Sequence, residues 1–466
     1  MDKGTIEKLL IANRGEIAVR IIRAARDLGI RTVQVYSDAD KDSRAVRMAD
    51  EAVNIGPPQA AKSYLDVGAI LKAAAETGAD AIHPGYGFLA ENAAFADAVA
   101  DAGLIFVGPS GDTIRLMGDK AAARAEAKKA GVPTVPGSDG VVEDMEAAAR
   151  LAADIGFPVM IKAAAGGGGR GIRIAHDADE FRALAPQASS EAKAAFGDGG
   201  IYVEKVIERA RHIEVQVLGD GEDAIHFFER ECSLQRRRQK VWEEAPSAVL
   251  KEDVRHELCR SAVALARAVR YKGAGTIEYL YDDVTGAFYF IEMNTRIQVE
   301  HPVTEMICGA DLVAEMIAIA GGGRLRVGQD AISRAGHAIE VRLNAEDPAN
   351  NFMPFPGIVG ELLAPDGPGV RFDHMLYPGY AVPPFYDSLL GKLIVWAEDR
   401  DMAMMRLKRA LGELRIEGLP TTAPLFEALL ESDDVRASAV HTRWLEPWLE
   451  DNLDLIRQKK EAHGHG

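Results

Sequence analysis

The chain has 466 residues, enough for two or three domains that each bury a core. Its formal net charge is −17, from 54 Lys and Arg against 71 Asp and Glu, which argues against general binding of nucleic acids or anionic membranes. No apolar run approaches the length of a membrane span. Three widely spaced cysteines match no zinc pattern or disulfide framework, so we expect a reducing compartment, the cytoplasm.

Residues 1–115 alternate short apolar segments with helical ones. A turn at Asn13–Glu16 leads into a helix through about Leu28. Strands are expected at 8–12, 32–36, 81–84 and 104–108. This βαβ series predicts a doubly wound parallel sheet. A dinucleotide site is not indicated, because no G-x-G-x-x-G follows the first strand.

Residues 116–206 carry signals for a nucleotide. A helix opens near Lys120, and a buried strand at 158–162 ends in Lys162. Four glycines at 166–169 follow, and then the strand Ile172–Ile174. Glycines in a hairpin loop let backbone N–H groups wrap around phosphate oxygens and let the loop open and close. A flexible surface linker is the alternative, and a P-loop is excluded because no G-K-[ST] follows.

A basic run lies at 229–240, between strand-like segments. It holds five cationic residues in an otherwise acidic chain. A solvated face or a localisation signal is the ordinary interpretation of such a run. A site that neutralises several phosphate charges is the alternative.

The densest signal begins with two strands, at 275–281 and 288–291, joined by a turn at 282–286. Folded as a hairpin, they place Glu278 opposite Glu292, and like charges directly opposite destabilise a sheet. A divalent cation between them resolves the conflict, and Asn294 points to the same face. Carboxylate and amide oxygens suit Mg²⁺ or Mn²⁺. A solvated strand face is the alternative.

The segment Glu292–Pro302 resembles, over eleven residues without a gap, the active-site segment of biotin carboxylases, members of the ATP-grasp superfamily. Three other segments resemble the same family: His83–Asn92, His337–Pro348 and Tyr386–Ile394. In all, the resemblance spans roughly Lys8 to Glu450. The chain departs from the family at Ala90, where Ser is common, at Arg238, where His is common, and over Leu419–Thr422.

The resemblance implies an α/β fold that becomes α+β in its later parts. The expected parts are an N-terminal pre-ATP-grasp domain over 1–115, an ATP-grasp domain over 116–335 with a mobile lid at 134–206, a separate C-terminal unit over 336–446 and a tail over 447–466. We expect the last residues, Glu461–Gly466, to be frayed.

The resemblance also implies a reaction and its cofactors. ATP with Mg²⁺ or Mn²⁺, two ions in all, converts bicarbonate to carboxyphosphate, and biotin on a separate carrier protein accepts the carboxyl group. Glu300 is implied as the general base, and Arg342 as the cation that stabilises the ureido oxyanion of biotin. The implied metal ligands are Glu278, Glu292 and Asn294; the bicarbonate ligands are Lys240, Arg296, Gln298, Val299 and Glu300; the nucleotide ligands are Lys120, Lys162, Gly168, Gly169, Glu204, Lys205, Ile207, His212, Gln235, Arg238, Glu278 and Glu292.

The implied partners are a biotin carboxyl carrier protein, carboxyltransferase subunits and a second copy of the chain, with no nucleic acid and no membrane. The final acceptor stays open among acetyl-CoA, as in fatty acid synthesis, propionyl-CoA, pyruvate and urea. No carrier motif is present, because Met402–Met405 lacks the biotinylated lysine and lies in a predicted helix. Another ATP-grasp carboxylate ligase and an inactive scaffold subunit are the alternatives.

Overall fold

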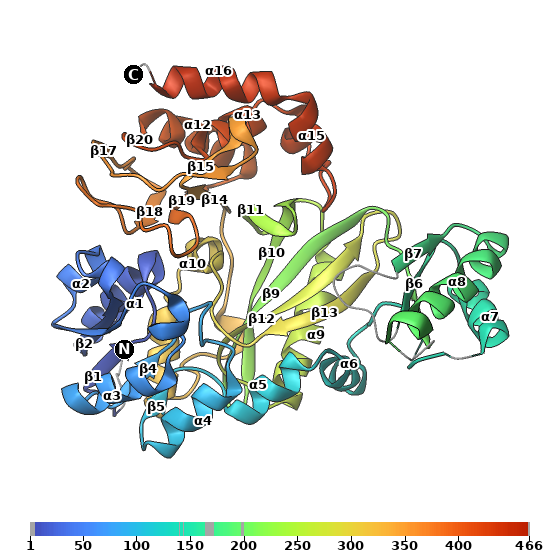
Figure 1. The fold of residues 1–466 in the computed structure, drawn as a ribbon, viewed down its shortest axis with the longest axis horizontal. Coiled ribbons are helices and arrows are strands. Elements are labelled where there is room, and N and C mark those ends of the chain that lie inside the picture. The colour runs from blue at the N-terminus through green and yellow to red at the C-terminus, as the bar shows by residue number, and fades with distance from the viewer. Residues whose placement is uncertain (1–4, 139, 143, 164–171, 197–199, 465–466) are drawn as a thin grey trace. The chain divides into compact units, whose positions relative to one another are not determined.

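The computed structural model describes residues 5–138, 140–142, 144–163, 172–196 and 200–464 (Figure 1). Two compact units form. Unit 1 comprises Met1–Val132, Arg211–Tyr279 and Glu292–Gly466, and unit 2 comprises Pro133–Ala210 and Leu280–Ile291. Among the described residues, no helix combines the length and apolarity needed to cross a membrane.

The first part of unit 1 is the parallel sheet that the sequence predicts, with strand order β3-β2-β1-β4-β5. Its strands are β1 (Lys8–Ile11), β2 (Arg31–Ser37), β3 (Glu51–Gly56), β4 (Ala81–His83) and β5 (Ile105–Phe106). Its helices are α1 (Gly15–Asp27), α2 (Arg44–Met48), α3 (Val67–Thr77), α4 (Ala93–Asp101) and α5 (Gly111–Gly118). The sequence analysis missed β3, whose side chains alternate between half-buried and exposed over most of its length.

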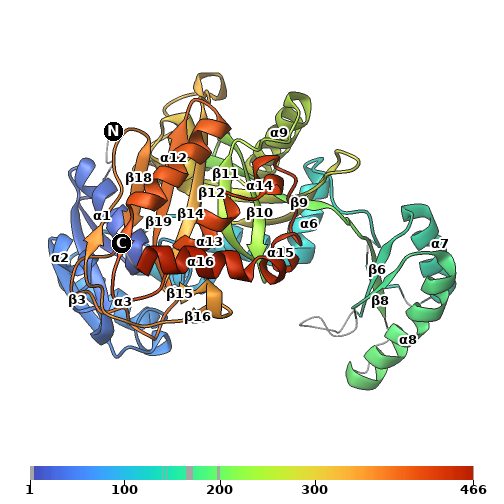
Figure 2. The same cartoon turned by 90° about the horizontal axis from the view of Figure 1, so that it is seen from above.

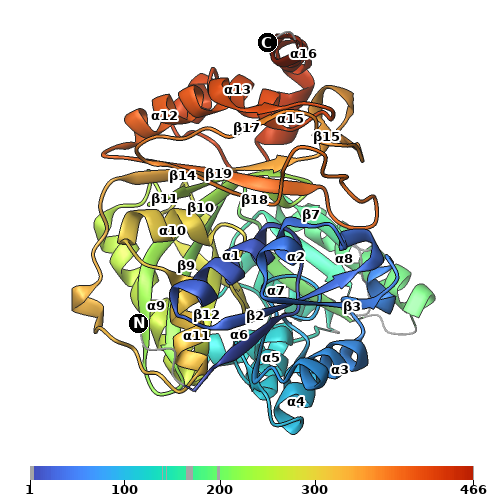
Figure 3. The ribbon, with the colours of Figure 1, turned by 90° about the vertical axis from the view of Figure 1, so that its left-hand side faces the viewer.

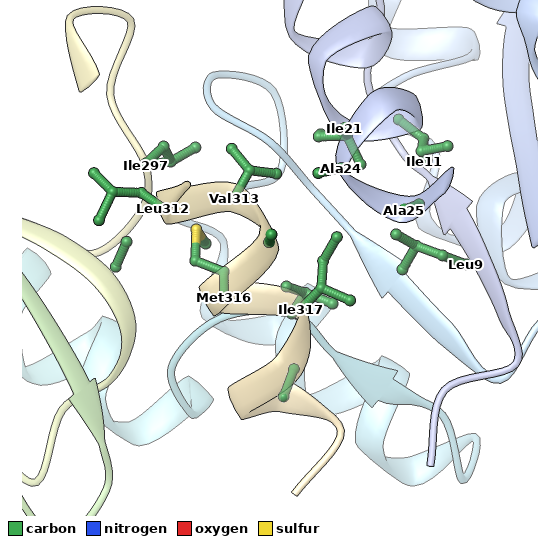
Figure 4. Packing of buried hydrophobic residues seen from close by; sticks show 14 of the residues in the cluster. Leu9, Ile11, Ile21, Ala24, Ala25, Ile297, Leu312, Val313, Met316 and Ile317 are labelled. Carbon is green, nitrogen blue, oxygen red and sulfur yellow. The ribbon is translucent and has the colours of Figure 1, made fainter. Parts of the chain in front are cut away.

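Alternation along β1 builds a core on each face of this sheet. Leu9 and Ile11 pack with α1 and with α11 (Leu312–Ala320), as Figure 4 shows. Leu10 points to the opposite face, toward Ile70 of α3 and Phe95 of α4. The α1 helix therefore connects the parallel sheet with α11, which follows the candidate site in the chain.

The second part of unit 1 is built on a sheet with strand order β13-β12-β9-β10-β11-β14-β19-β18. The strands are β9 (Ala210–Asp220), β10 (Ala224–Arg236), β11 (Gln239–Ala245), β12 (Lys272–Asp282), β13 (Phe288–Asn294), β14 (His337–Asn344), β18 (Val370–His374) and β19 (Leu389–Ala397). Shorter pairs are β15 (Glu346–Asp347) with β16 (Met353–Pro354) and β17 (Leu362–Leu363) with β20 (Arg415–Ile416). The helices are α6 (Lys120–Lys129), α9 (Glu252–Ala268), α10 (His301–Cys308), α12 (Arg400–Glu413), α13 (Ala423–Leu429) and α14 (Asp433–Arg436).

The register of β11, β14 and β19 separates apolar from charged side chains. Val341 and Leu393 face one side, where they pack with α12 and α13 (Figure 3). The side chains that alternate with these along the strands face the other side. On that side, Glu243 lies opposite Glu340, and Arg342 lies opposite Lys392 on the neighbouring strand. Since side chains alternate along a strand, this register places charged groups together on the second face.

The separate C-terminal unit expected over 336–446 stays a prediction, and its strands join the large sheet of unit 1. Strand β14 pairs with β11 over Trp242–Ala245, and β19 and β18 continue beyond it, all within unit 1. Local sequence patterns indicate strands but not which distant strands pair, so the sequence did not predict this pairing.

The prediction of a frayed C-terminus over Glu461–Gly466 is wrong as far as Gly464, because the last helix continues to that residue. Helices α15 (Leu445–Asp451) and α16 (Leu453–Gly464) form there, and α16 packs on α13 (Figure 2). Ile456 is fully buried in the same apolar cluster as α13, and Lys460 pairs with Asp347 at 2.6 Å. The buried Ile456 anchors this helix, although its composition is mostly polar.

Unit 2 contains a sheet of order β7-β6-β8 and two helices. The elements are β6 (Val159–Ala163), β7 (Ile172–Ala175), β8 (Ile201–Lys205), α7 (Met145–Ile155) and α8 (Ala178–Phe196). Ile161, Val203 and Phe181 belong to its core. The predicted strands on either side of the glycines are confirmed, whereas Gly168 and Gly169 lie outside the described residues. The mobility of a lid at 134–206 stays a prediction.

Candidate functional site

The hairpin of β12 and β13 brings the predicted metal ligands together in unit 1. Asn294 donates from Nδ2 to Glu278 Oε1 at 2.9 Å, and both residues are buried. Glu292 is half-buried; burial, and then the charge of Glu278, raise the pKa of its carboxyl. A cation stabilises two carboxylates that lie near each other, so this donor set fits a hard divalent ion.

Lys240 contacts three of the carboxylates at or next to this hairpin. Its Nζ lies 2.5 Å from Glu214, 3.0 Å from Glu278 and 2.6 Å from Glu300. Burial alone would lower the pKa of Lys240, but the three carboxylates outweigh it and raise that pKa well above its usual value. The ammonium therefore stays charged and balances groups from β9, β12 and the segment after β13.

His212 lies beside the same carboxylates. Its Nε2 is 3.3 Å from Glu214 and 3.3 Å from Glu278. Burial and the charge of Lys240 would lower the pKa of the imidazole, but the two carboxylates outweigh them and raise it to about 9. His212 is thus a cation at neutral pH, which suits a contact with phosphate oxygens.

Glu300 lies between two cations. Lys240 contacts one of its oxygens, and Arg342 donates from Nη2 to the other at 3.0 Å. Burial would raise the pKa of the Glu300 carboxyl, but Lys240, with Arg342 and Arg230, lowers it below its usual value. Glu300 is therefore ionised at neutral pH, the state that a general base requires.

Arg342 also binds Glu243, a residue that the sequence analysis missed. Its Nε donates to Glu243 Oε1 at 2.6 Å. Burial, and then the charge of Glu300, raise the pKa of Glu243 to about 7, although Arg342 opposes them. The guanidinium is thus aimed at two carboxylates at once.

A second missed residue, Arg230, is fully buried beneath this cluster. Its guanidinium makes a hydrogen bond to each of five side chains: Glu214 at 2.7 Å, Gln216 at 2.8 Å, Thr304 at 2.9 Å, Thr276 at 3.1 Å and Gln298 at 2.9 Å. All five N–H donors are satisfied, as a buried guanidinium requires. The available signal was a run of three charged residues, Glu229–Glu231, within a strand that is otherwise suited to burial.

The predicted bicarbonate ligands other than Lys240, which is on β11, lie on the segment between β13 and α10. Gln298 accepts from Arg230 through Oε1 and donates from Nε2 to Glu278 at 2.9 Å. Arg296 donates to Asn294 Oδ1 at 3.1 Å. The Val299 carbonyl accepts from Lys392 at 2.7 Å. Gln298 and Lys240 thus share one oxygen of Glu278, and Lys240 and Arg342 share Glu300.

The basic run at 229–240 does not form one cluster. It is the β10–β11 hairpin, and its cations point to different places. Arg230 and Lys240 reach the same carboxylate, Glu214, whereas Arg236 lies 4.0 Å over the ring of Phe352. Arg238 is exposed at the turn, with φ of +66°. The twist of a hairpin and its turn separates residues that are adjacent in sequence.

The other predicted nucleotide ligands of unit 1 have ordinary local partners. Lys120 is exposed at the start of α6, which the Asp119 side chain caps. Gln235 is buried and donates to the carbonyl of Cys232 at 2.8 Å.

The remaining predicted nucleotide ligands belong to unit 2. Lys162 pairs with Glu204 across β6 and β8. Lys205 donates to the carbonyls of Gly156 at 2.8 Å and Phe157 at 2.9 Å, and Ile207 is buried.

Comparison with known proteins covers almost all of the chain. Residues 5–114 and 340–447 match the N-terminal and C-terminal domains of biotin carboxylase, and residues 119–327 match the ATP-binding domain of the carbamoyl-phosphate synthase L chain. Biotin carboxylase from Nostoc sp. is 54% identical over 441 residues, 94% of this chain and 98% of that protein. Biotin carboxylase 1 from Bacillus subtilis is 53% identical over 444 residues, 95% of this chain and 99% of that protein.

The chain belongs to the biotin carboxylase family. Its fold is that of the family's ATP-grasp enzymes. The enzyme is a ligase, and its activity is the ATP-dependent carboxylation of biotin.

Solved structures agree along the whole length. The biotin carboxylase domain of a thermophilic 2-oxoglutarate carboxylase, described as bound to ADP, matches with a TM-score of 0.91 at 48% identity, covering 97% of this chain and 99% of that one. The corresponding Hydrogenobacter thermophilus domain, described with MgADP and bicarbonate, matches with a TM-score of 0.83 at 47% identity and the same coverage. Rhizobium etli pyruvate carboxylase matches with a TM-score of 0.83 at 43% identity, over 96% of this chain and 41% of that longer one.

Proposed function

We propose that this chain catalyses the first half-reaction of a biotin-dependent carboxylase. Bicarbonate reacts with ATP to give carboxyphosphate and ADP, and biotin on a separate carrier protein then receives the carboxyl group. The observation that carries the proposal is the ionised Glu300 placed between Lys240 and Arg342. Support comes from relatives of the same length named biotin carboxylase, and from a related structure described with MgADP and bicarbonate.

Mg²⁺, or Mn²⁺ in its place, is the proposed metal, with two ions per active site. Glu278, Glu292 and Asn294 would hold it, since all three lie on the β12–β13 hairpin and the charge of Glu278 acts on Glu292. Bound metal would neutralise phosphate charge on the nucleotide. The proposed nucleotide ligands are those predicted from the sequence, of which Gly168 and Gly169 lie outside the described residues.

The chain's own residues divide the chemistry between two carboxylate–cation pairs. Lys240, Arg296, Gln298 and the Val299 backbone would bind bicarbonate, and Glu300 would accept its proton. Arg342 would stabilise the oxyanion of biotin, because its guanidinium is held in place by Glu243 and Glu300. Each cation is already charged and oriented before a substrate binds.

Two substitutions separate these steps. Glu300→Gln removes the base, so bicarbonate-dependent ATP cleavage is expected to fall by about 10²–10⁴-fold. Arg342→Gln leaves carboxyphosphate formation in part and reduces carboxybiotin formation much further. Phosphate release and carboxybiotin are measured side by side, with the exposed Arg457→Gln as control.

Equal loss of both rates in Arg342→Gln would contradict the division of labour. ATP cleavage in the wild type that is independent of bicarbonate would favour another ATP-grasp ligase instead.

The proposed partners are a biotin carboxyl carrier protein and carboxyltransferase subunits, and the proposed assembly is a homodimer. Support is indirect: related structures are described as subunits or domains of pyruvate and 2-oxoglutarate carboxylases. Cytoplasmic location stays a prediction, since some relatives are chloroplastic. The final acceptor is chosen by the transferase and stays open.

A further inference from the structure

Residues 295–300 form a segment with no strand or helix of its own. Strand β13 ends at Asn294, and α10 begins at His301. Regular backbone hydrogen bonding therefore does not position the four proposed bicarbonate ligands on this segment. Their positions depend on side chains from other parts of unit 1.

Glu91 holds the beginning of the segment. It belongs to the conspicuous loop His83–Asn92, to which the proposed function gives no role. Its Oε1 accepts from the backbone N–H of Thr295 at 3.2 Å, and its Oε2 accepts from Nε of Arg296 at 2.9 Å. One carboxylate thus fixes the backbone and the guanidinium of neighbouring residues.

Lys392 holds the end of the segment. It is completely buried, and its Nζ donates to the Val299 carbonyl at 2.7 Å. The ammonium lies 3.2 Å from Glu16, which also accepts a hydrogen bond from the hydroxyl of Tyr86. A buried lysine has little freedom to choose other partners, so the Val299 peptide is fixed.

The position of Lys392 in the sheet links the two halves of the site. It lies directly opposite Arg342 on the neighbouring strand, on the same face. Glu16 lies in the first turn of α1, after β1, and Tyr86 follows β4, so both come from the carboxyl ends of neighbouring strands in the parallel sheet. The predicted turn Asn13–Glu16 and the segment Tyr386–Ile394 therefore meet at the Lys392 ammonium, which binds one carbonyl of the bicarbonate segment.

We propose that Glu91 and Lys392 are positioning residues that hold the segment 295–300 in the shape that binds bicarbonate. Neither contacts a reacting atom; Glu91 acts through Arg296, and Lys392 acts through the Val299 peptide. The proposal rests on the proposed function, because it takes bicarbonate as the ligand of this segment. A purely structural role would change stability without a selective effect on one substrate.

The test compares Glu91→Gln and Lys392→Met with a matched pair of controls. Lys392→Met leaves Glu16 without its ion-pair partner, so the double variant Glu16→Gln/Lys392→Met is included in case the single one does not fold. Controls are Glu76→Gln and Lys72→Met, an exposed ion pair on α3. Amide hydrogen exchange is followed on peptides that cover 293–301, and KM is measured separately for bicarbonate and for ATP in the cleavage assay.

The expected result is faster exchange at 295–300 in Glu91→Gln and in the Lys392 variants, and unchanged exchange in the controls. KM for bicarbonate is expected to rise by about tenfold or more, the effect of losing a charge-assisted hydrogen bond, while KM for ATP changes less than about twofold.

Unchanged exchange at 295–300 would overturn the proposal, as would equal changes in both KM values. Wild-type enzyme that cleaves ATP without bicarbonate would overturn the proposed function and the bicarbonate role together. Normal wild-type activity with unaffected variants would overturn the positioning role alone.

Discussion

The charged residues of unit 1 and those of unit 2 are held in different ways. In unit 1, Lys240 contacts three carboxylates and Arg230 contacts five side chains, and both are buried or nearly so. In unit 2, the side chains of Lys162 and Glu204 are 36% and 24% exposed, and the two pair with each other. Burying a charge is costly unless it is fully paired, whereas a half-exposed pair contributes little.

The difference indicates which of the proposed binding groups are already oriented before a ligand binds. The groups proposed to bind and deprotonate bicarbonate are oriented by one another, so little reorganisation is needed at the moment of reaction. The lysine proposed to bind the nucleotide has a partner that a phosphate can replace at small cost. The first arrangement favours rate, and the second favours exchange of the nucleotide.

The largest expected effect comes from removing the centre of the buried network. Arg230→Met leaves Glu214 buried without one of its three cationic neighbours, the other two being Lys240 and His212. The free energy of unfolding is expected to fall by about 3–5 kcal/mol, the usual effect of breaking a buried ion pair from one side. Chemical denaturation measures it, with the exposed Arg409→Met as control. A loss below about 1 kcal/mol would mean that unit 1 tolerates unpaired charge and would remove the contrast with unit 2.

A smaller effect is expected from pH, because buried groups of unit 1 titrate outside their usual range. His83 at the end of β4 is completely buried, and burial lowers the pKa of its imidazole to about 3. Its neutral form accepts a hydrogen bond from Gly85 N–H at 3.0 Å. Below the unfolded pKa of about 6.5, the unfolded chain binds a proton that the native chain does not, so stability falls as pH decreases from there toward 3.

His83→Asn keeps an acceptor near the same place and cannot titrate. When the pH is lowered from 6.5 to 5, the unfolding free energy of this variant is expected to decrease by about 2 kcal/mol less than that of the wild type. Denaturation curves at several pH values measure the difference. Parallel pH dependence in the two proteins would show that His83 is not held neutral.

The smallest effect on stability is expected in unit 2. Lys162→Met breaks a half-exposed pair, so the unfolding free energy is expected to change by less than about 1 kcal/mol. The KM for ATP is expected to rise clearly, since the lysine is proposed to hold phosphate. Denaturation and steady-state kinetics on the same preparation test both parts. A large loss of stability with an unchanged KM would reverse the contrast between the units.

Residues close in sequence were placed correctly more often than residues brought together from far apart. The hairpin that joins Glu278 to Asn294 was predictable, because alternation and a turn signal are local properties. The parallel sheet was predictable for the same reason. Arg230 was missed because its partners come from four other elements and loops, and no local pattern reports such pairing.

The same limit explains two features of the C-terminal part that the sequence did not predict. The pairing of β14 with β11 depends on residues about a hundred positions apart, and α16 is fixed by one buried Ile456 in a polar segment. The sequence shows where the chain differs from the family, as at Arg238. It did not predict that Arg238 lies at an exposed turn.

The continuous sheet of unit 1 limits how the chain can be divided. A chain cut before His337 would leave β11 as an open edge, with unpaired backbone N–H and C=O groups over Trp242–Ala245. Such edges recruit strands from other molecules and lead to aggregation. Recombination within this family is therefore expected to preserve everything from β1 to β19 as one inherited piece. The longer pyruvate carboxylase fits that expectation, because it matches 96% of this chain over 41% of its own length.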